Sequence, residues 1–209
     1  MSEQTHKILT TSEEPNWRTP SWLQEALKRE FDIRLDAAAT ASDTIAGDWF
    51  GPGSGMDDAL AIEAWGAFVA PREAIFCNPP YSRKLKMPIT PWIARMAEEG
   101  QHRTVIGLIP YAPQTRAWRR YVVGFEHRAT EIRKFPFRLK FEPPEGYVSK
   151  AKDGKTHGAN VNTAVVIWKP TGEYPKALPW GPFERYWVPA EVPKGQKYHE
   201  AAETDDEGE

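Results

Sequence analysis

Short apolar runs alternate along this chain with segments whose apolar residues recur at helical spacing, and this alternation limits the possible folds more than any other feature. The predicted strands lie at residues 31–36, 73–78, 103–110, 130–135 and 162–168, with a short edge strand near residues 49 and 50. The predicted helices lie at residues 16–31, 57–69, 90–100 and 115–123. Alternation of this kind predicts an α/β fold in which a mixed sheet carries helices on both faces.

The ends of two predicted helices carry residues that favour helix termini. Thr19 is placed to act as the N-cap of the first helix, with Pro20 at its first helical position. Another helix starts with the same pair of residue types at Thr90 and ends at Gly100. The chain after Lys169 is rich in proline and tryptophan, and we expect coil there.

The length of 209 residues, 40% of them hydrophobic, suits one well-packed domain. We expect a disordered start at 1–15, a folded domain at 16–170, and an extension with a disordered acidic tail at 171–209. The last ten residues hold six acidic and no basic side chains; without them the chain has 27 basic and 23 acidic residues and a net charge of +4. The folded part is therefore mildly basic, which permits a nucleic-acid partner.

Several classes of protein are disfavoured by what the sequence contains. The first fifteen residues have no apolar core, and apolar runs reach only about seven residues, so we expect neither a signal peptide nor a membrane span. A single cysteine, Cys77, forms no internal disulfide and suits the reducing cytoplasm. The five histidines show no ligand spacing, so we expect no metal site.

The sequence Asn78-Pro79-Pro80-Tyr81 directly follows the apolar run Ile75–Cys77. Each proline restricts the residue before it to extended backbone and lacks an N–H group, so this turn is rigid. The Asn78 side chain and the Pro79 carbonyl offer two acceptor oxygens, and Tyr81 offers an aromatic face. Two acceptors and a ring match a planar heterocycle that bears an exocyclic amino group.

Such an arrangement can activate an aromatic amine, whose lone pair is otherwise delocalised into its ring. Two acceptors that bind the two amine hydrogens localise the lone pair and stabilise the positive charge that develops when the nitrogen attacks an electrophile. The alternative is a purely structural turn with a packed tyrosine. Asp36, Asn78 and Pro110 all lie at carboxyl ends of predicted strands, where α/β sheets bind ligands, so one cleft could gather them.

The order of several motifs resembles that of phage-type DNA N6-adenine methyltransferases, the Dam-like family. The motifs are WRTP at 17–20, LDAAA at 35–39, DDALAIEAW at 57–65, NPPYS at 78–82 and KFPFRLKF at 134–141, and the resemblance covers roughly residues 15–170. It implies a Rossmann-like methyltransferase fold, S-adenosylmethionine as the methyl donor and adenine in DNA as the acceptor. It also suggests a phage or prophage protein in the cytoplasm of a bacterial host.

The resemblance assigns roles to individual residues. Thr19, Pro20 and Asp36 would lie at the methionine end of the cofactor, Ala37 and Ala38 would let it approach the backbone, and Asp58 or its neighbour Asp57 would read its adenine amino group. Asn78, Pro79, Pro80 and Tyr81 would engage the target adenine. Asp36 could instead be a turn residue and Asp58 an ordinary acid at a helix N-terminus. The first motif lacks the glycine-rich turn of many methyltransferases, and the residue that holds the cofactor ribose stays open.

Basic and aromatic residues are interleaved in two segments, as contact with a nucleic-acid backbone and base stacking require. The predicted DNA contacts are Arg83, Lys84, Lys86, Arg133, Lys134, Phe135, Phe137, Arg138 and Lys140. The alternative is that the phenylalanines belong to the core and the charges to a solvated face. The helix with Arg116, Arg119 and Arg120 could face DNA or solvent, and the polar insertion at 142–160 could be a recognition loop or simply disordered.

Two other functions are compatible with these motifs. The same chemistry could act on RNA or on a protein glutamine, or the chain could be a catalytically inactive protein that binds DNA. The sequence does not specify the target site, a preference for duplex or single strand, or the oligomeric state.

Overall fold

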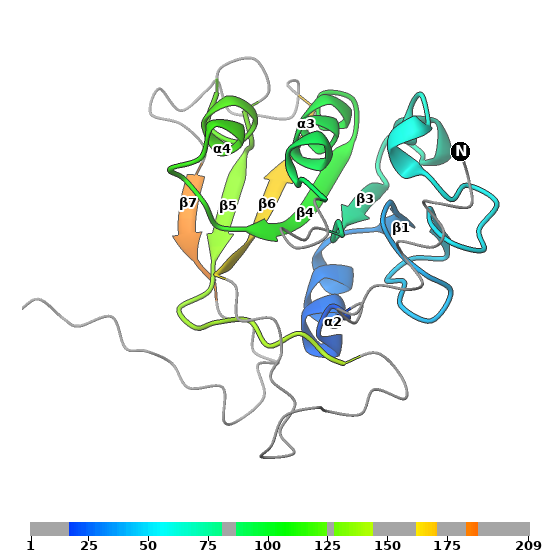
Figure 1. Ribbon diagram of the computed structural model, residues 1–209, viewed down its shortest axis with the longest axis horizontal. Helices are drawn as coiled ribbons and strands as arrows, with labels where there is room; N and C mark the ends of the chain where they lie inside the picture. The colour runs from blue at the N-terminus through cyan, green and yellow to red at the C-terminus, as the bar shows by residue number, and fades with distance from the viewer. Residues whose placement is uncertain (1–16, 81–86, 125–127, 144–161, 171–182, 188–209) are drawn as a thin grey trace, which may run out of the picture.

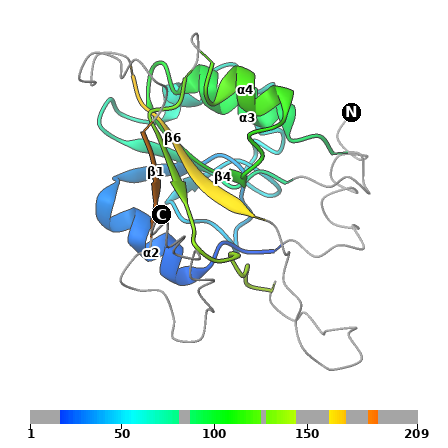
Figure 2. The ribbon, with the colours of Figure 1, turned by 90° about the vertical axis from the view of Figure 1, so that its left-hand side faces the viewer.

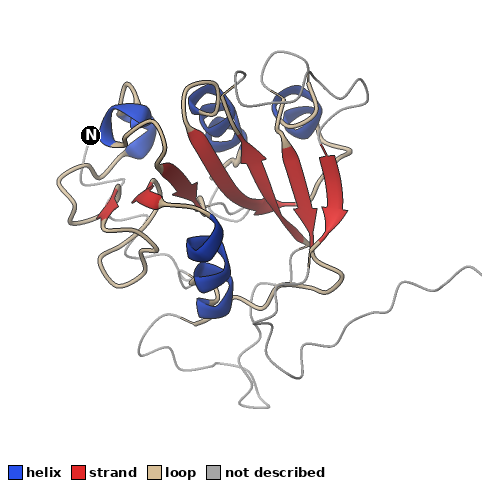
Figure 3. Cartoon of the chain, turned by 180° about the vertical axis from the view of Figure 1, so that it is seen from behind, coloured by secondary structure: helices blue, strands red, loops and turns tan. Residues whose placement is uncertain are grey.

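A mixed seven-stranded sheet forms the centre of the protein (Figure 1). The computed structural model describes residues 17–80, 87–124, 128–143, 162–170 and 183–187. Across the sheet the strand order is β2-β1-β3-β4-β6-β5-β7, and β6 runs antiparallel to both of its neighbours while the other pairs are parallel (Figure 3). The strands are β1 (Ile33–Asp36), β2 (Asp48–Trp49), β3 (Ala74–Cys77), β4 (Thr104–Pro110), β5 (Glu131–Lys134), β6 (Thr163–Trp168) and β7 (Phe183–Tyr186).

Helices cover both faces of this sheet (Figure 2). Helix α2 (Ser21–Glu30) packs on one face, where its Leu23 and Leu27 join a buried cluster with Phe76 of β3. Helices α3 (Thr90–Glu99) and α4 (Arg116–Tyr121) pack on the other face, where a second buried cluster includes Met96 and Trp118. Successive strand residues alternate between the two clusters, as the pleat requires. The predicted α/β class, mixed sheet and two-sided cover are therefore confirmed.

The start of helix α2 differs from the prediction. Thr19 is not its N-cap: Pro20 occupies that position and provides no side-chain cap. The carboxylate of Glu142, from the segment after β5, accepts hydrogen bonds from the backbone N–H and the hydroxyl of Ser21 instead. An acidic group at this end of a helix also balances the helix dipole. A residue 121 positions away thus supplies the cap, and Thr19 is free for a different contact.

Residues 57–69 do not form the predicted α-helix. They form two 3-10 turns, η1 (Ala59–Ala61) and η2 (Trp65–Phe68). The carboxylate of Glu99 in helix α3 accepts hydrogen bonds from the backbone N–H groups of Trp65 and Gly66, both at 2.9 Å. The buried Trp65 ring donates its own N–H to the Ala59 carbonyl at 2.8 Å. These contacts stabilise two separate turns, although the local apolar pattern favours one continuous helix.

The sheet continues past residue 170, where we expected the ordered domain to end and coil to follow. Strand β7 pairs in parallel with β5, with Arg133 opposite Arg185. Residues 144–161, which include nearly all of the insertion predicted as a recognition loop, lie outside the described part of the chain.

Candidate active site

Strand β1 lies between β2 and β3 in the sheet. The chain therefore adds β2 on one side of β1 and then crosses over to add β3 on the other side. Ligands of open α/β sheets bind beyond the carboxyl ends of the strands at such a point. Asp36 is the last residue of β1, and Asn78 directly follows β3. The two strand ends are joined by the hydrogen bond from the Ala37 N–H to the Phe76 carbonyl, at 2.8 Å. The structure therefore brings together two residues that were predicted to share a cleft.

Asn78 is half-buried, and among the described residues its side chain makes one hydrogen bond. Its Nδ2 donates a hydrogen bond to the hydroxyl oxygen of Thr19 at 3.1 Å. Thr19 has 4% of its surface exposed, and Pro79 is buried as well. Because Nδ2 is directed at Thr19, the amide oxygen Oδ1 points away from that contact, and no described residue donates a hydrogen bond to it. Pro80 is half-buried, whereas Tyr81 lies outside the described residues.

The carboxyl group of Asp36 is 3% exposed and organises the loop that follows β1. Its two oxygens accept hydrogen bonds from the backbone N–H groups of Ala38 at 3.3 Å and Ile45 at 3.2 Å. Burial raises the pKa of Asp36 to about 7, against the opposing effect of these two hydrogen bonds. Burial likewise raises the pKa of nearby Asp43 to about 6. The turn role that the sequence left open for Asp36 is thus present in this structure.

The alanines after Asp36 form a closely packed strand end. Ala37 is fully buried and Ala38 is partly exposed. Ala39 donates to the Phe50 carbonyl at 3.0 Å. The next residue, Gly51, has a φ of 142°, and a Cβ there would lie 2.1 Å from the Ala39 carbonyl oxygen. The loop after β2 therefore lies directly against this segment because it carries a glycine at the point of approach.

Asp58 is exposed and caps the first 3-10 turn, where its carboxylate accepts from the Leu60 N–H at 3.1 Å. Asp57 accepts from the Gly53 N–H at 3.3 Å. Both acids therefore have local structural partners. The capping role that the sequence analysis gave as the alternative for Asp58 occurs here, at a 3-10 turn.

Arg133, Phe135 and Phe137, three of the predicted DNA contacts, are buried in the protein. Arg133 is 1% exposed; its guanidinium binds both Glu30 and Glu131 and lies over the Trp187 ring at 4.8 Å. Phe135 and Phe137 pack edge-on against Trp22 of helix α2, each with ring centroids 6.2 Å apart. The core role that was the alternative for the phenylalanines is observed, and these three side chains present no surface to DNA in this structure.

The other predicted basic contacts differ in their surroundings. Lys134 pairs with Glu184 at 2.7 Å and lies over the rings of Tyr111 and Tyr186. Arg138 and Lys140 are exposed, because the buried residues of their segment alternate with them. The three arginines of helix α4 are exposed too. Arg83, Lys84 and Lys86 lie outside the described residues.

Two residues near this edge were missed by the sequence analysis. Tyr111 directly follows β4, and its hydroxyl donates to Glu184 at 2.9 Å. Its position next to Pro110, at a predicted strand end, was the one signal available. Glu142 pairs through its backbone with Arg18 and caps helix α2, and no local pattern in the sequence marks that role.

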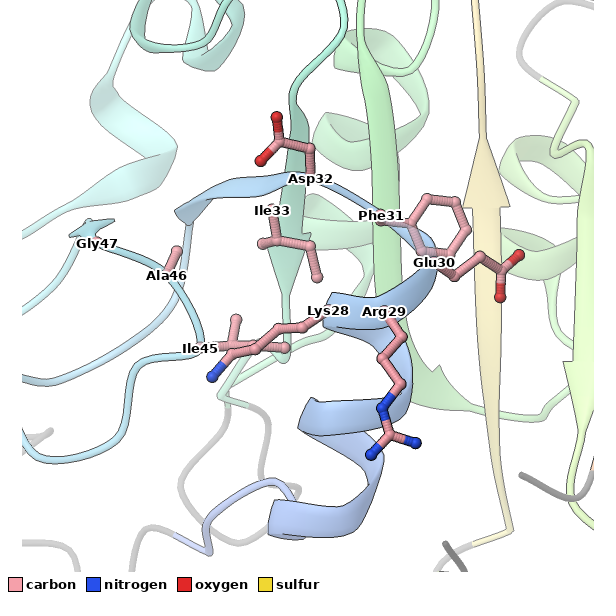
Figure 4. A pocket seen from close by; sticks show the side chains of 9 residues that line it. All are labelled: Lys28, Arg29, Glu30, Phe31, Asp32, Ile33, Ile45, Ala46 and Gly47. Atoms are coloured by element: carbon pink, nitrogen blue, oxygen red, sulfur yellow. The ribbon is translucent and has the colours of Figure 1, made fainter. Parts of the chain in front are cut away.

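A hollow of about 420 Å³ lies elsewhere, between the end of helix α2, the start of β1 and residues 45–47 (Figure 4). It is at the amino end of β1, opposite the edge that carries Asp36 and Asn78, so we do not place the active site there. Within the described ranges no three His, Cys, Asp or Glu residues are grouped to hold a metal ion. The described helices include none long and apolar enough to cross a membrane.

Comparison with known proteins gives one family. The model of a family described as DNA N-6-adenine-methyltransferase (Dam) matches residues 6–185, which is most of the chain. No curated protein matches the chain.

Proposed function

Because the chain belongs to the DNA N-6-adenine-methyltransferase (Dam) family, we propose that it transfers a methyl group from S-adenosylmethionine to the N6 amine of adenine in DNA. The observation that carries this proposal is the position of Asn78. It follows β3 at the point where the chain reverses across the sheet, and its amide nitrogen is directed at Thr19. The same topology supports the predicted Rossmann-like methyltransferase fold.

In this proposal Asn78 and Pro79 activate the amine. The Asn78 Oδ1 and the Pro79 carbonyl accept hydrogen bonds from the two N6 hydrogens, which localises the nitrogen lone pair. They also stabilise the positive charge that develops on N6 as its bond to the methyl carbon forms. The methylated nitrogen is acidic and loses one proton to water, so the chain needs no strong base. Tyr81 is proposed to stack on the adenine ring after the base has left the duplex stack.

The residues at the end of β1 fit a methyl donor that carries a methionine group and an adenosine group. Asp36 would lie on the side of the methionine ammonium, Ala38, which is partly exposed, would let the donor approach the backbone, and the exposed Asp58 would accept from the adenine amino group. S-adenosylmethionine, when bound, supplies the electrophilic methyl group. The sulfonium and ammonium charges of this donor suit a site that carries acidic side chains.

Contacts to DNA are proposed for basic side chains that follow strand ends in the sequence; among the described residues, Arg138 and Lys140 are exposed. Arg138 and Lys140 follow β5, and Arg83, Lys84 and Lys86 follow the Asn78 turn in the sequence. Lysine and arginine at such places bind phosphates without reading the base sequence. We do not assign this role to Arg133, Phe135 or Phe137, because they are buried.

The test compares wild-type protein with Asn78→Ala on adenine-containing duplex DNA and radiolabelled S-adenosylmethionine. We expect Asn78→Ala to abolish transfer and to leave cofactor affinity, measured by calorimetry, within about twofold. Gln101→Ala removes another side-chain amide, next to the amino end of β4, and should retain activity. Sequencing that detects N6-methyladenine in DNA from expressing cells identifies the target site. Full activity of Asn78→Ala, or methylation only of RNA or a protein glutamine, would overturn the proposal.

A further inference from the structure

The side-chain amide of Asn78 has two ends of similar size and opposite chemistry. Oδ1 accepts hydrogen bonds, whereas Nδ2 donates them. A half-turn about the last side-chain bond exchanges the two ends with little change in shape. The proposed chemistry requires Oδ1 to face the amine, since the opposite orientation would place two donors against each other. A carboxylate at this position would present an acceptor in either orientation, so the problem is specific to asparagine.

Thr19 is the residue that contacts the donor end of this amide. Its hydroxyl oxygen accepts from Nδ2 at 3.1 Å, across 59 positions of sequence, and Thr19 is 4% exposed. Without this hydroxyl, Nδ2 would face a buried site in which no other described residue accepts from it, which disfavours this orientation. A hydroxyl can also donate, but in the reversed orientation Nδ2 would face the substrate amine, which is itself a donor. The pair of Thr19 and the substrate therefore selects one orientation.

The backbone on both sides of Thr19 is fixed. Arg18 pairs with Glu142 through two backbone hydrogen bonds, at 2.8 and 2.9 Å. The Thr19 carbonyl accepts from the Gln24 side chain at 3.1 Å, and the next residue, Pro20, is the N-cap residue of helix α2. The hydroxyl is thus held by helix α2 and by the segment after β5, two elements outside the strand that carries Asn78.

We propose that Thr19 is a positioning residue that orients the Asn78 amide, with Oδ1 toward the substrate amine and Nδ2 toward its own hydroxyl. This inference rests on the proposed function. It differs from the role that the sequence resemblance gave Thr19, which was contact with the methionine end of the cofactor. The two roles predict different kinetic changes, because orientation of the amide affects the transfer step and a cofactor contact affects cofactor affinity.

The kinetic test uses Thr19→Val, which keeps the shape and removes the hydroxyl, and Thr19→Ser, which keeps the hydroxyl. We expect Thr19→Val to lower kcat about tenfold, with the dissociation constant of S-adenosylmethionine and the KM for DNA within about twofold. Thr19→Ser should retain most of the activity. Thr104→Val, at the amino end of β4, is the matched control and should retain full activity. A large loss of cofactor affinity with kcat unchanged would overturn the proposal.

A second comparison separates orientation from packing. In the Asn78→Asp background both ends of the side chain accept, so adding Thr19→Val should lower any remaining kcat by less than about twofold. An equal loss in the two backgrounds would mean that Thr19 acts through packing, and the inference would be wrong.

A third readout needs no catalysis. The side-chain NH₂ signals of Asn78, identified by their loss in Asn78→Ala, should shift and exchange faster with water in Thr19→Val, and should not change in Thr104→Val. Unchanged signals in Thr19→Val would refute the contact. If the wild-type protein methylates no DNA, the proposed function fails, and this measurement still decides whether the Thr19 hydroxyl accepts from the Asn78 amide.

Discussion

Asp36 should make the protein less stable as the pH rises, and Asp36→Asn should remove that dependence. Burial raises the pKa of Asp36 in the folded protein to about 7, from 3.8 in the exposed state. Between these two values the folded protein binds a proton that the unfolded chain has released. The free energy of unfolding therefore falls with increasing pH and levels off above about pH 7. A depressed carboxyl pKa, the more common case, would give the opposite slope.

The size of the effect follows from this shift. For one group with these two pKa values, the free energy of unfolding falls by about 3 kcal/mol between pH 5 and pH 8. Asparagine does not titrate, so Asp36→Asn removes this contribution. It also keeps one acceptor oxygen and turns an NH₂ group toward either the Ala38 or the Ile45 N–H. That mismatch should cost about 1–3 kcal/mol at every pH. The variant is therefore expected to be less stable at pH 5 and to have a flatter profile.

The assay is urea unfolding at pH 5, 6, 7 and 8, followed by circular dichroism. The quantity to compare is the difference between variant and wild type at each pH, because Asp43, whose pKa is raised to about 6, contributes its own slope to both. The control is Asp32→Asn, which replaces an exposed carboxylate just before β1. Its profile of unfolding free energy against pH should run parallel to that of the wild type. Parallel profiles for Asp36→Asn and wild type over this range would refute the argument that burial controls the protonation of Asp36.

Four further predictions concern Arg133, Arg138, Gly51 and the cofactor role of Asp36. Arg133→Ala should lower the free energy of unfolding by about 3 kcal/mol in urea, because it leaves Glu30 and Glu131 without their buried partner. Arg138→Ala should change stability by less than about 0.5 kcal/mol and reduce the salt dependence of DNA binding by about one counterion, measured by fluorescence anisotropy; unchanged binding would exclude the phosphate contact. Gly51→Ala should lower the melting temperature because its Cβ would clash with a backbone carbonyl in a positive-φ conformation. Asp36→Ala should weaken S-adenosylmethionine binding in calorimetry, and an unchanged affinity would remove Asp36 from the cofactor site.

Much of the fold could be predicted because its signals are local. The strands that became β3, β4 and β6 are short apolar runs, and helix α3 carries apolar residues at helical spacing with a proline at its start and a glycine at its end. These patterns depend on neighbours along the chain, so they can be read without knowing the tertiary structure. Strand β7 has the sequence Phe-Glu-Arg-Tyr and no apolar run, and it is a strand because its backbone pairs with β5.

Three errors share one physical cause, which is that a distant side chain changed the local outcome. Glu99 binds the N–H groups at Trp65, so residues 57–69 form two turns and no single helix. Glu142 caps helix α2, so Thr19 does not. Arg133 was read as an exposed cation because charged residues usually are, but Glu30 neutralises it from 103 positions away. A sequence pattern identifies residue types that need a partner and gives no sign of which distant residue will provide it.

One feature of the candidate site follows from a local sequence pattern, and another depends on residues that are distant in the sequence. The turn at Asn78 was predictable because two prolines after an apolar strand constrain the backbone locally, whatever the rest of the chain does. The orientation of its amide was not, since it depends on the Thr19 hydroxyl, whose position is set by helix α2 and by the pairing of Arg18 with Glu142. The same Arg18–Glu142 pairing lies at the start of the insertion at 142–160. On the proposed role of Thr19, the orientation of the acceptor oxygen depends on Glu142, Arg18 and Thr19, which are contiguous in space and lie on two separate segments of the chain.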